Sequence, residues 1–232
     1  MGDSLRGANY IFLLPAVVLY FVSVWFRTLR WQYLLRNAKA IPQRRLYPVV
    51  VIGYMANNLL PIRLGELVRA YFLGSKEGVS KTTALATIVV ERTFDGVTLL
   101  LVALAVGAFL PLSLALEGLG GAARLSPMIV ALLVSLPFVV VLGGLLLVAG
   151  SARITRGIAG FALRLAPKGQ KERAGNLVTL FIKGLEALRS PGRILVLLGL
   201  SLPVWLAEAA MYYTISLSFN LSQPFTVILL VT

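Results

Sequence analysis

The 232-residue chain is 58% hydrophobic and only 13% charged, and its mean hydropathy is +0.87. Soluble domains usually contain about 45–50% apolar and about 25% charged residues, so the composition argues against a water-soluble enzyme, a disordered chain and a coiled coil. Lys and Arg number 22 against 9 Asp and Glu, which gives a net charge of +13. Because the basic residues lie between long apolar runs, the pattern predicts a polytopic membrane protein with cationic loops, and no nucleic-acid partner.

Cysteine and histidine are both absent from the sequence. Their absence excludes disulfides, thiol nucleophiles, Cys/His zinc sites and every Ser-His or Cys-His catalytic pair. Any chemistry must therefore use carboxylates, Arg or Lys, hydroxyls or backbone groups. We predict no catalytic residue, no metal site and no cofactor.

The apolar runs predict an all-α protein. Crossing about 30 Å of hydrocarbon takes about 20 helical residues. In chain order, the predicted membrane spans cover residues 10–31, 82–110, 126–150 and 194–217, and a shorter apolar run covers 224–232. Prolines lie just inside the start of four apolar runs, as is typical of helix N-termini, at Pro48, Pro127, Pro191 and Pro224.

The positions of the cations predict the topology. Six Lys and Arg residues fall between Arg27 and Arg45, four between Arg63 and Lys81, and nine between Arg153 and Arg193. The positive-inside rule places all three stretches in the cytoplasm.

If the first two basic stretches share one side, residues 47–73 must enter the membrane and return. Tyr47–Ala56 reads as a short helix that Asn57 and Asn58 break, and Pro61 starts a second helix to about Leu73. Broken backbone at membrane depth needs cover from protein or a wet cavity, and it recurs at transporter binding sites. The alternative is one kinked transmembrane helix, which reverses the topology downstream.

The third basic stretch, residues 151–193, combines helically spaced apolar residues with interleaved cations. This pattern predicts two amphipathic interfacial helices broken at residues 167–169, held on the cytoplasmic face by anionic lipid. The aromatic residues near the span ends are predicted to form interfacial belts; they are Trp25, Trp31, Tyr33, Tyr212 and Tyr213.

Ionisable residues inside membrane segments are functional candidates, because burying them is costly. On the second half-helix, Arg63, Glu66 and Arg69 recur at i, i+3 and i+6 and share one face. The opposite face is apolar, with Leu64, Leu67, Val68 and Tyr71. The side chains of Asn57 and Asn58 either satisfy backbone groups freed at the break or bind a ligand.

A second charged group lies in the middle of the 82–110 run. Glu91 and Asp95 stand at i, i+4, so both carboxylates lie on one helical face, and Arg92 flanks them. Glu208 is a candidate additional site, alone within the 194–217 span.

Two alternatives compete with a binding site. The carboxylates and arginines could simply neutralise one another and pin the hairpin against the long helix, although buried ion pairs often add little net stability. A paired-carboxylate glycosidase needs an open, water-filled cleft between the two groups, which this chain does not obviously build.

Three motifs resemble one known family. They read Arg27-Thr-Leu-Arg30-Trp31, then Asn57-Asn-Leu-Leu-Pro61-Ile-Arg63-Leu-Gly65-Glu66-Leu-Val-Arg69-Ala-Tyr, then Glu91-Arg92-Thr-Phe-Asp95-Gly96. Together they resemble the lysylphosphatidylglycerol synthase transmembrane region, a flippase-like family also met as the membrane half of the multiple peptide resistance factor. The resemblance covers nearly the whole chain.

The resemblance implies a multi-pass plasma-membrane protein of bacteria or archaea that moves or presents amphiphilic lipids, such as aminoacylated phosphatidylglycerol or lipid-linked saccharides. Family members usually have one more helix before this start and a further broken-helix motif after residue 232, so we expect the chain to be a fragment. It has no acyltransferase or glycosyltransferase domain, so the synthase activity in the family name is not carried over.

The leading hypothesis is therefore a non-enzymatic, flippase-like protein whose partners are membrane lipids. In it, Arg63, Arg69 and Arg92 contact a lipid phosphate. Glu66, Glu91 and Asp95 orient those arginines or meet a cationic head group, and Asn57 and Asn58 line the break. The alternatives are a non-transporting scaffold for a lipid-modifying enzyme and a membrane-embedded transferase acting on a polyprenyl lipid. The sequence defines no oligomeric state.

Overall fold

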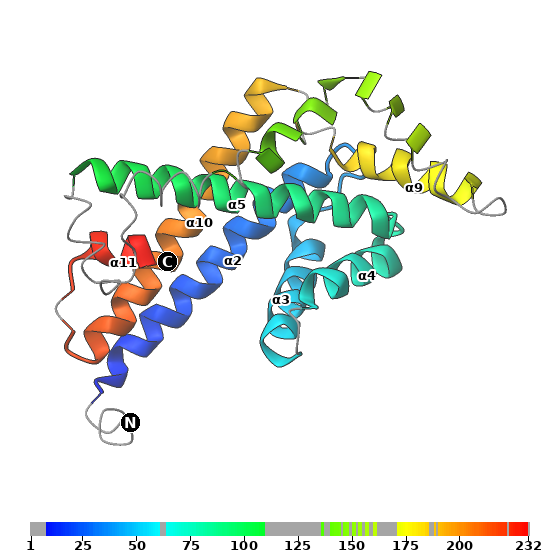
Figure 1. Cartoon of the computed structure of the whole chain (residues 1–232). Coiled ribbons are helices and arrows are strands. Elements are labelled where there is room, and N and C mark those ends of the chain that lie inside the picture. The colour runs from blue at the N-terminus through cyan, green and yellow to red at the C-terminus, as the bar shows by residue number, and fades with distance from the viewer. Residues whose placement is uncertain are drawn as a thin grey trace. The chain divides into compact units, whose positions relative to one another are not determined.

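The computed structural model describes residues 8–60, 64–109, 171–185, 190–221 and 223–231, with residue 188 and short stretches between 136 and 161. All regular structure in these residues is helical, which confirms the predicted all-α class for the described part of the chain (Figure 1). Two of the described helical stretches, Tyr10–Leu35 and Pro191–Ser218, are long and apolar enough to cross a membrane. The full polytopic arrangement stays a prediction.

The long helices form close to their predicted positions. The first span comprises a 3-10 turn, η1 (Tyr10–Phe12), and α2 (Leu13–Leu35). The others are α5 (Lys81–Phe109), α10 (Pro191–Ser218) and the short α11 (Phe225–Val231). Most of the predicted 126–150 span lies outside the described residues.

The chain divides into two compact units. The first contains Met1–Phe26, Asp95–Val139 and Ser201–Thr232, and the second contains Arg27–Phe94 and Val140–Leu200. In the first unit, the backbone N–H of Asn9 donates to the Ser218 carbonyl at 2.8 Å, and Tyr213 packs edge-on against Phe225. The second unit carries most of the predicted site residues.

In the second unit, a helical hairpin connects α2 to α5. It consists of α3 (Gln43–Leu59) and α4 (Gly65–Glu77), which pack against each other (Figure 1). A helix–break–helix in this region is therefore confirmed. Its entry into the membrane stays a prediction.

The boundaries of the hairpin helices correct the prediction in three places. Asn57 and Asn58 do not break α3 but lie in its last turn, which the bond from the Leu60 N–H to the Ala56 carbonyl closes at 2.8 Å. Pro48 lies inside α3, because the extended backbone of Pro42 sets the helix start at Gln43. The second helix runs on to Glu77 and ends at Gly78, whose φ of 66° suits glycine.

The base of the hairpin is held by one acidic residue at the end of α4. Lys39 donates to the Glu77 carbonyl at 2.6 Å and to its carboxylate at 3.2 Å, and Arg45 lies 3.7 Å from the same carboxylate. These contacts tie the α2–α3 connection and the first turn of α3 to the last turn of α4. The two ends of the hairpin therefore lie close together.

The 151–193 stretch contains α9 (Lys171–Gly184), which confirms a helix in the second half of the predicted segment. The Thr83 hydroxyl of α5 donates to the Leu180 carbonyl at 3.1 Å, and Leu185 just beyond α9 is fully buried. The predicted break at residues 167–169 lies outside the described residues, and the interfacial position stays a prediction.

Candidate functional site

The candidate site is centred on the carboxylate of Glu91, in the middle of α5. This side chain is fully buried. Arg69 of α4 binds it with two hydrogen bonds, Nη2 to Oε2 at 2.8 Å and Nη1 to Oε1 at 3.3 Å. Arg30 of α2 lies 3.4 Å from Oε1, and Arg92 lies 3.7 Å from it. One carboxylate thus connects three helices, and we call these four side chains the Glu91 cluster.

The guanidinium of Arg69 is held on its second side by an aromatic ring. Its central carbon lies 4.2 Å from the centre of the Trp31 ring, which is a favourable cation–π distance. The Trp31 indole N–H donates to the Thr87 hydroxyl at 3.1 Å, so α5 fixes the ring. Arg69 therefore lies between a negative charge and an aromatic face, both without contact with solvent.

Two glycines bring α3 and α4 close enough for this arrangement. A Cβ atom built on Gly53 would overlap the side-chain stem of Arg69, and one built on Gly65 would overlap the Gly53 carbonyl oxygen. Only the absence of both side chains lets Arg69 pass α3 and reach Glu91.

One edge of the cluster is exposed. The Arg92 side chain is 40% exposed and lies 3.7 Å from the carboxylate of Glu66, which is 29% exposed. The Tyr54 hydroxyl of α3 accepts hydrogen bonds from Arg92 at 3.2 Å and from Arg27 of α2 at 2.9 Å. A ligand could reach Arg92, Glu66 and Tyr54 without opening the buried centre.

The two asparagines have different environments. Asn57 accepts a hydrogen bond from the Gly65 N–H at 2.7 Å, which satisfies a backbone donor at the start of α4. This observation favours the structural role that the sequence left open for Asn57. The side chain of Asn58 is exposed.

The structure brings four of the predicted site residues together: Glu66, Arg69, Glu91 and Arg92. Asp95 is buried one turn further along α5, beyond the boundary of the unit, and Glu208 is half-buried in the first unit. Arg63 lies outside the described residues. Nowhere in the described ranges do three or more acidic residues gather as a metal site would need.

Sequence reasoning missed part of the site. Arg27 and Arg30 were counted among the cytoplasmic cations although they lie within the predicted 10–31 span, and both are buried on α2, 5% and 0% exposed. Trp31 was predicted for an interfacial belt and is instead fully buried against Arg69. The spacing of Arg27, Arg30, Trp31 and Leu34 was the available signal, since these residues share one face of a continued helix.

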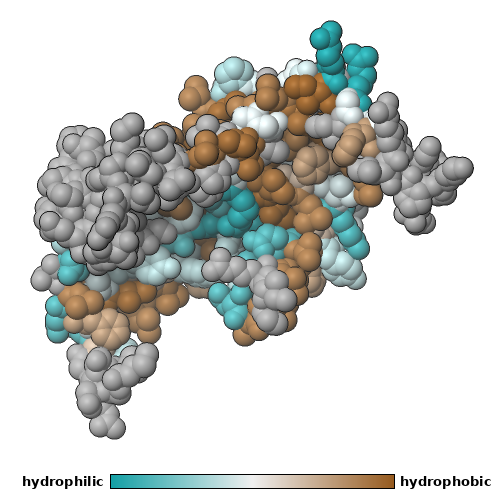
Figure 2. All heavy atoms as spheres, in the orientation of Figure 1, coloured by the Kyte–Doolittle hydropathy of each residue, from teal (hydrophilic) through white to brown (hydrophobic). Residues whose placement is uncertain are grey.

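The hairpin combines a buried arginine with exposed apolar side chains. Arg69 is buried, whereas the apolar side chains of Leu67 and Tyr71 on the same helix are 54% and 56% exposed. Figure 2 shows hydrophobic surface on part of the hairpin, next to hydrophilic patches. Large exposed apolar surfaces mark contact with lipid or protein, and charges directed inwards are typical of membrane proteins. Fold and site together define a helical membrane protein with a buried ionic cluster.

Comparison with known proteins agrees with this class. The family described as lysylphosphatidylglycerol synthase TM region matches residues 1–232, and the chain belongs to this family. It is 38% identical over 96 residues to a UPF0104 membrane protein of Methanothermobacter thermautotrophicus and 28% identical over 94 residues to one of Methanocaldococcus jannaschii. The two matches cover 40% and 39% of this chain, and each covers 28% of the relative's length. No solved structure matches the chain.

Proposed function

We propose that the protein binds the head group of an amphiphilic lipid at the exposed edge of the Glu91 cluster and moves the lipid across the plasma membrane or presents it there. The observation that carries the proposal is a half-exposed Arg92 connected to buried arginines. Four arginines take part in the contacts described above, Arg27, Arg30, Arg69 and Arg92, against Glu66 and Glu91. The most exposed member of this group is a cation, Arg92 at 40% against 29% for Glu66, which favours an anionic ligand.

Each side chain then has a distinct role. Arg92 meets a lipid phosphate with charge-assisted hydrogen bonds, for which the planar guanidinium is well suited. Glu91 holds Arg30 and Arg69 in place from the buried side. Glu66 orients Arg92 or meets the cationic part of an aminoacylated head group. The proposal contains no catalytic step.

Replacing Arg92 by Gln tests this site. We expect head-group translocation by the whole protein in proteoliposomes to fall about tenfold or more, because a charge-assisted hydrogen bond contributes roughly 1.5–3 kcal/mol. Stability should change little, since Arg92 is half-exposed and its two ion-pair distances are both 3.7 Å. Lys76→Gln removes an exposed cation at the end of α4 and serves as the control. Equal transport by the Arg92 variant and the wild type would refute the site.

The second candidate function is a scaffold that binds a lipid-modifying enzyme and moves nothing. The observation in its favour is the bidentate pairing of Arg69 with Glu91, which connects helices and needs no ligand. It predicts that a synthase co-purifies with the protein and that proteoliposomes containing this protein alone translocate no lipid. Translocation without any partner excludes it.

We further propose that the hairpin is re-entrant and that the basic loops face the cytoplasm. The support is the exposed apolar surface near its turn, which includes Met55, Leu59 and Leu67. The same surface contacts hydrocarbon if the turn lies at membrane depth, and Arg69 stays covered on the buried face of α4.

Single cysteines give a direct test of the hairpin, because the chain contains none of its own. Arg44→Cys and Lys76→Cys place one exposed thiol at each end of the hairpin. A re-entrant hairpin predicts that a membrane-impermeant maleimide labels both positions from the same side. Labelling from opposite sides supports the kinked transmembrane helix instead. Leu67→Cys, near the turn, should react more slowly than either.

A further inference from the structure

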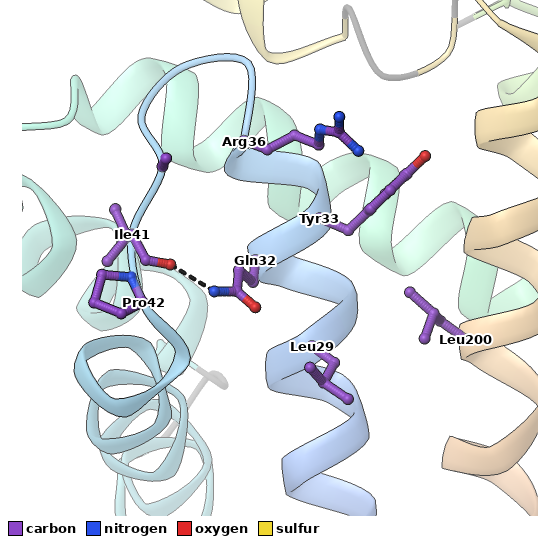
Figure 3. A pocket seen from close by; sticks show the side chains of 8 residues that line it. Leu29, Gln32, Tyr33, Arg36, Ile41, Pro42 and Leu200 are labelled. Carbon is purple, nitrogen blue, oxygen red and sulfur yellow. Dashed lines mark hydrogen bonds between the residues drawn. The ribbon is translucent and has the colours of Figure 1, made fainter.

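A second candidate ligand site lies away from the Glu91 cluster. A cavity of about 610 Å³ lies against the end of α2, the α2–α3 connection and the first part of α10. Its apolar wall includes Leu29, Ile41, Pro42 and Leu200 (Figure 3). The volume is within the range of small-molecule sites, about 300–1,000 Å³.

One end of this cavity is cationic. Arg36 follows the last residue of α2, is exposed, and stacks on the Tyr33 ring with 5.1 Å between its central carbon and the ring centre. Lys39 of the same connection and Arg45 at the start of α3 pair with Glu77, whereas no carboxylate within the described ranges pairs with Arg36. The guanidinium therefore remains available for an external anion.

The apolar part of the cavity extends inwards from that cation. Leu29 precedes Arg36 by seven residues, which corresponds to about 10 Å along a helix with a rise of about 1.5 Å per residue. Tyr33 and Leu200 project into the space between α2 and α10, and the Gln32 amide donates to the Ile41 carbonyl at 2.7 Å, which fixes the opposite wall (Figure 3). The cavity thus has a charged mouth and an apolar interior along a helix long enough to cross a membrane.

We propose that this cavity binds one anionic phospholipid, with its phosphate on Arg36 and one acyl chain along Leu29 and Leu200. The phosphate completes the pairing of Arg36, and the chain covers the apolar wall. A soluble anion fits the mouth but leaves the wall uncovered, and a neutral lipid leaves Arg36 without a counter-ion. This site is separate from the head-group site of the proposed function and does not depend on transport.

Photolabelling with phosphatidic acid that carries a diazirine on one acyl chain tests the proposal on the purified whole protein. We expect label on the peptides containing Leu29 and residues 40–42. Arg36→Gln should reduce that label about tenfold, as expected from the loss of a charge-assisted hydrogen bond. Leu29→Trp, which fills the interior, should reduce it as well. Arg92→Gln should leave it unchanged, which separates this site from the Glu91 cluster.

Arg44→Gln is the matched control, because Arg44 is an exposed cation near the start of α3 and does not line the cavity. Equal loss of label in the Arg44 and Arg36 variants means diffuse attraction to the basic surface and overturns the proposal. Full label in the Arg36 variant also overturns it. If glycerol phosphate competes as strongly as unlabelled phosphatidic acid, the cavity binds a soluble anion and the proposal is wrong. If diacylglycerol competes equally well, the phosphate has no role and the proposal is also wrong.

Discussion

Replacement of Glu91 by Gln is expected to lower the free energy of unfolding by about 3–5 kcal/mol, the usual result of removing one partner from a buried ion pair. The substitution keeps the volume of the side chain but removes its charge. Arg69 and Arg30, 2% and 0% exposed, then remain buried without their shared carboxylate. Arg69 cannot move to solvent, because it lies between α3 and the Trp31 ring. Equilibrium unfolding in mixed micelles measures the effect.

Glu66→Gln is the matched control for this experiment. Glu66 is 29% exposed and lies 3.7 Å from a half-exposed Arg92, so its loss should change the free energy of unfolding by less than about 1 kcal/mol. In the double variant, Glu91→Gln with Arg69→Gln, the free energy of unfolding should fall by less than the sum of the two single losses, since the two side chains interact directly. Equal stability of the Glu91 variant and the wild type would show that the cluster is hydrated in the native protein.

Helical periodicity was sufficient to predict two parts of the candidate site, the carboxylates of α5 and the charged face of α4. The i, i+4 spacing of Glu91 and Asp95 predicted one carboxylate face on α5, and both side chains are buried. The spacing of Glu66 and Arg69 likewise predicted the polar face of α4. Both predictions rest on the geometry of a single helix, which the sequence defines by itself.

The pairing between the parts was not predictable in this way. Arg30 joins Glu91 across 61 positions of sequence, and its place in a cationic cluster concealed it. The positive-inside rule counts every arginine near the end of a span as a loop residue. Which of these side chains are buried is decided by the packing of the helices, which the count does not contain. Arg27 and Arg30 both lie inside the predicted 10–31 span, so what changes their assignment is their contacts with Tyr54 and Glu91 and not the length of α2.

Replacement of Gly65 by Ala is expected to separate the hairpin helices and to weaken head-group binding. The new Cβ would lie 2.5 Å from the Asn57 side-chain oxygen and closer still to the Gly53 carbonyl oxygen. The second obstacle is backbone, so α3 and α4 must move apart, and overpacking of this kind costs about 1–3 kcal/mol. Alanine is favoured in helices, but Gly65 is the first residue of α4, where this gain is small.

The displacement affects function because Arg69 lies one turn beyond Gly65 on α4. When α4 moves, the two hydrogen bonds from Arg69 to Glu91 lengthen, and Glu66 of α4 moves away from Arg92. Gly199→Ala is the control, since no atom of the described residues lies within 4 Å of its new Cβ. Gly199 is inside α10, where alanine should stabilise by up to about 1 kcal/mol. Of these two variants, only the Gly65 variant should show a lower free energy of unfolding in mixed micelles and weaker head-group binding. A Gly65 variant as stable as the wild type would mean that the two helices do not approach this closely in the membrane.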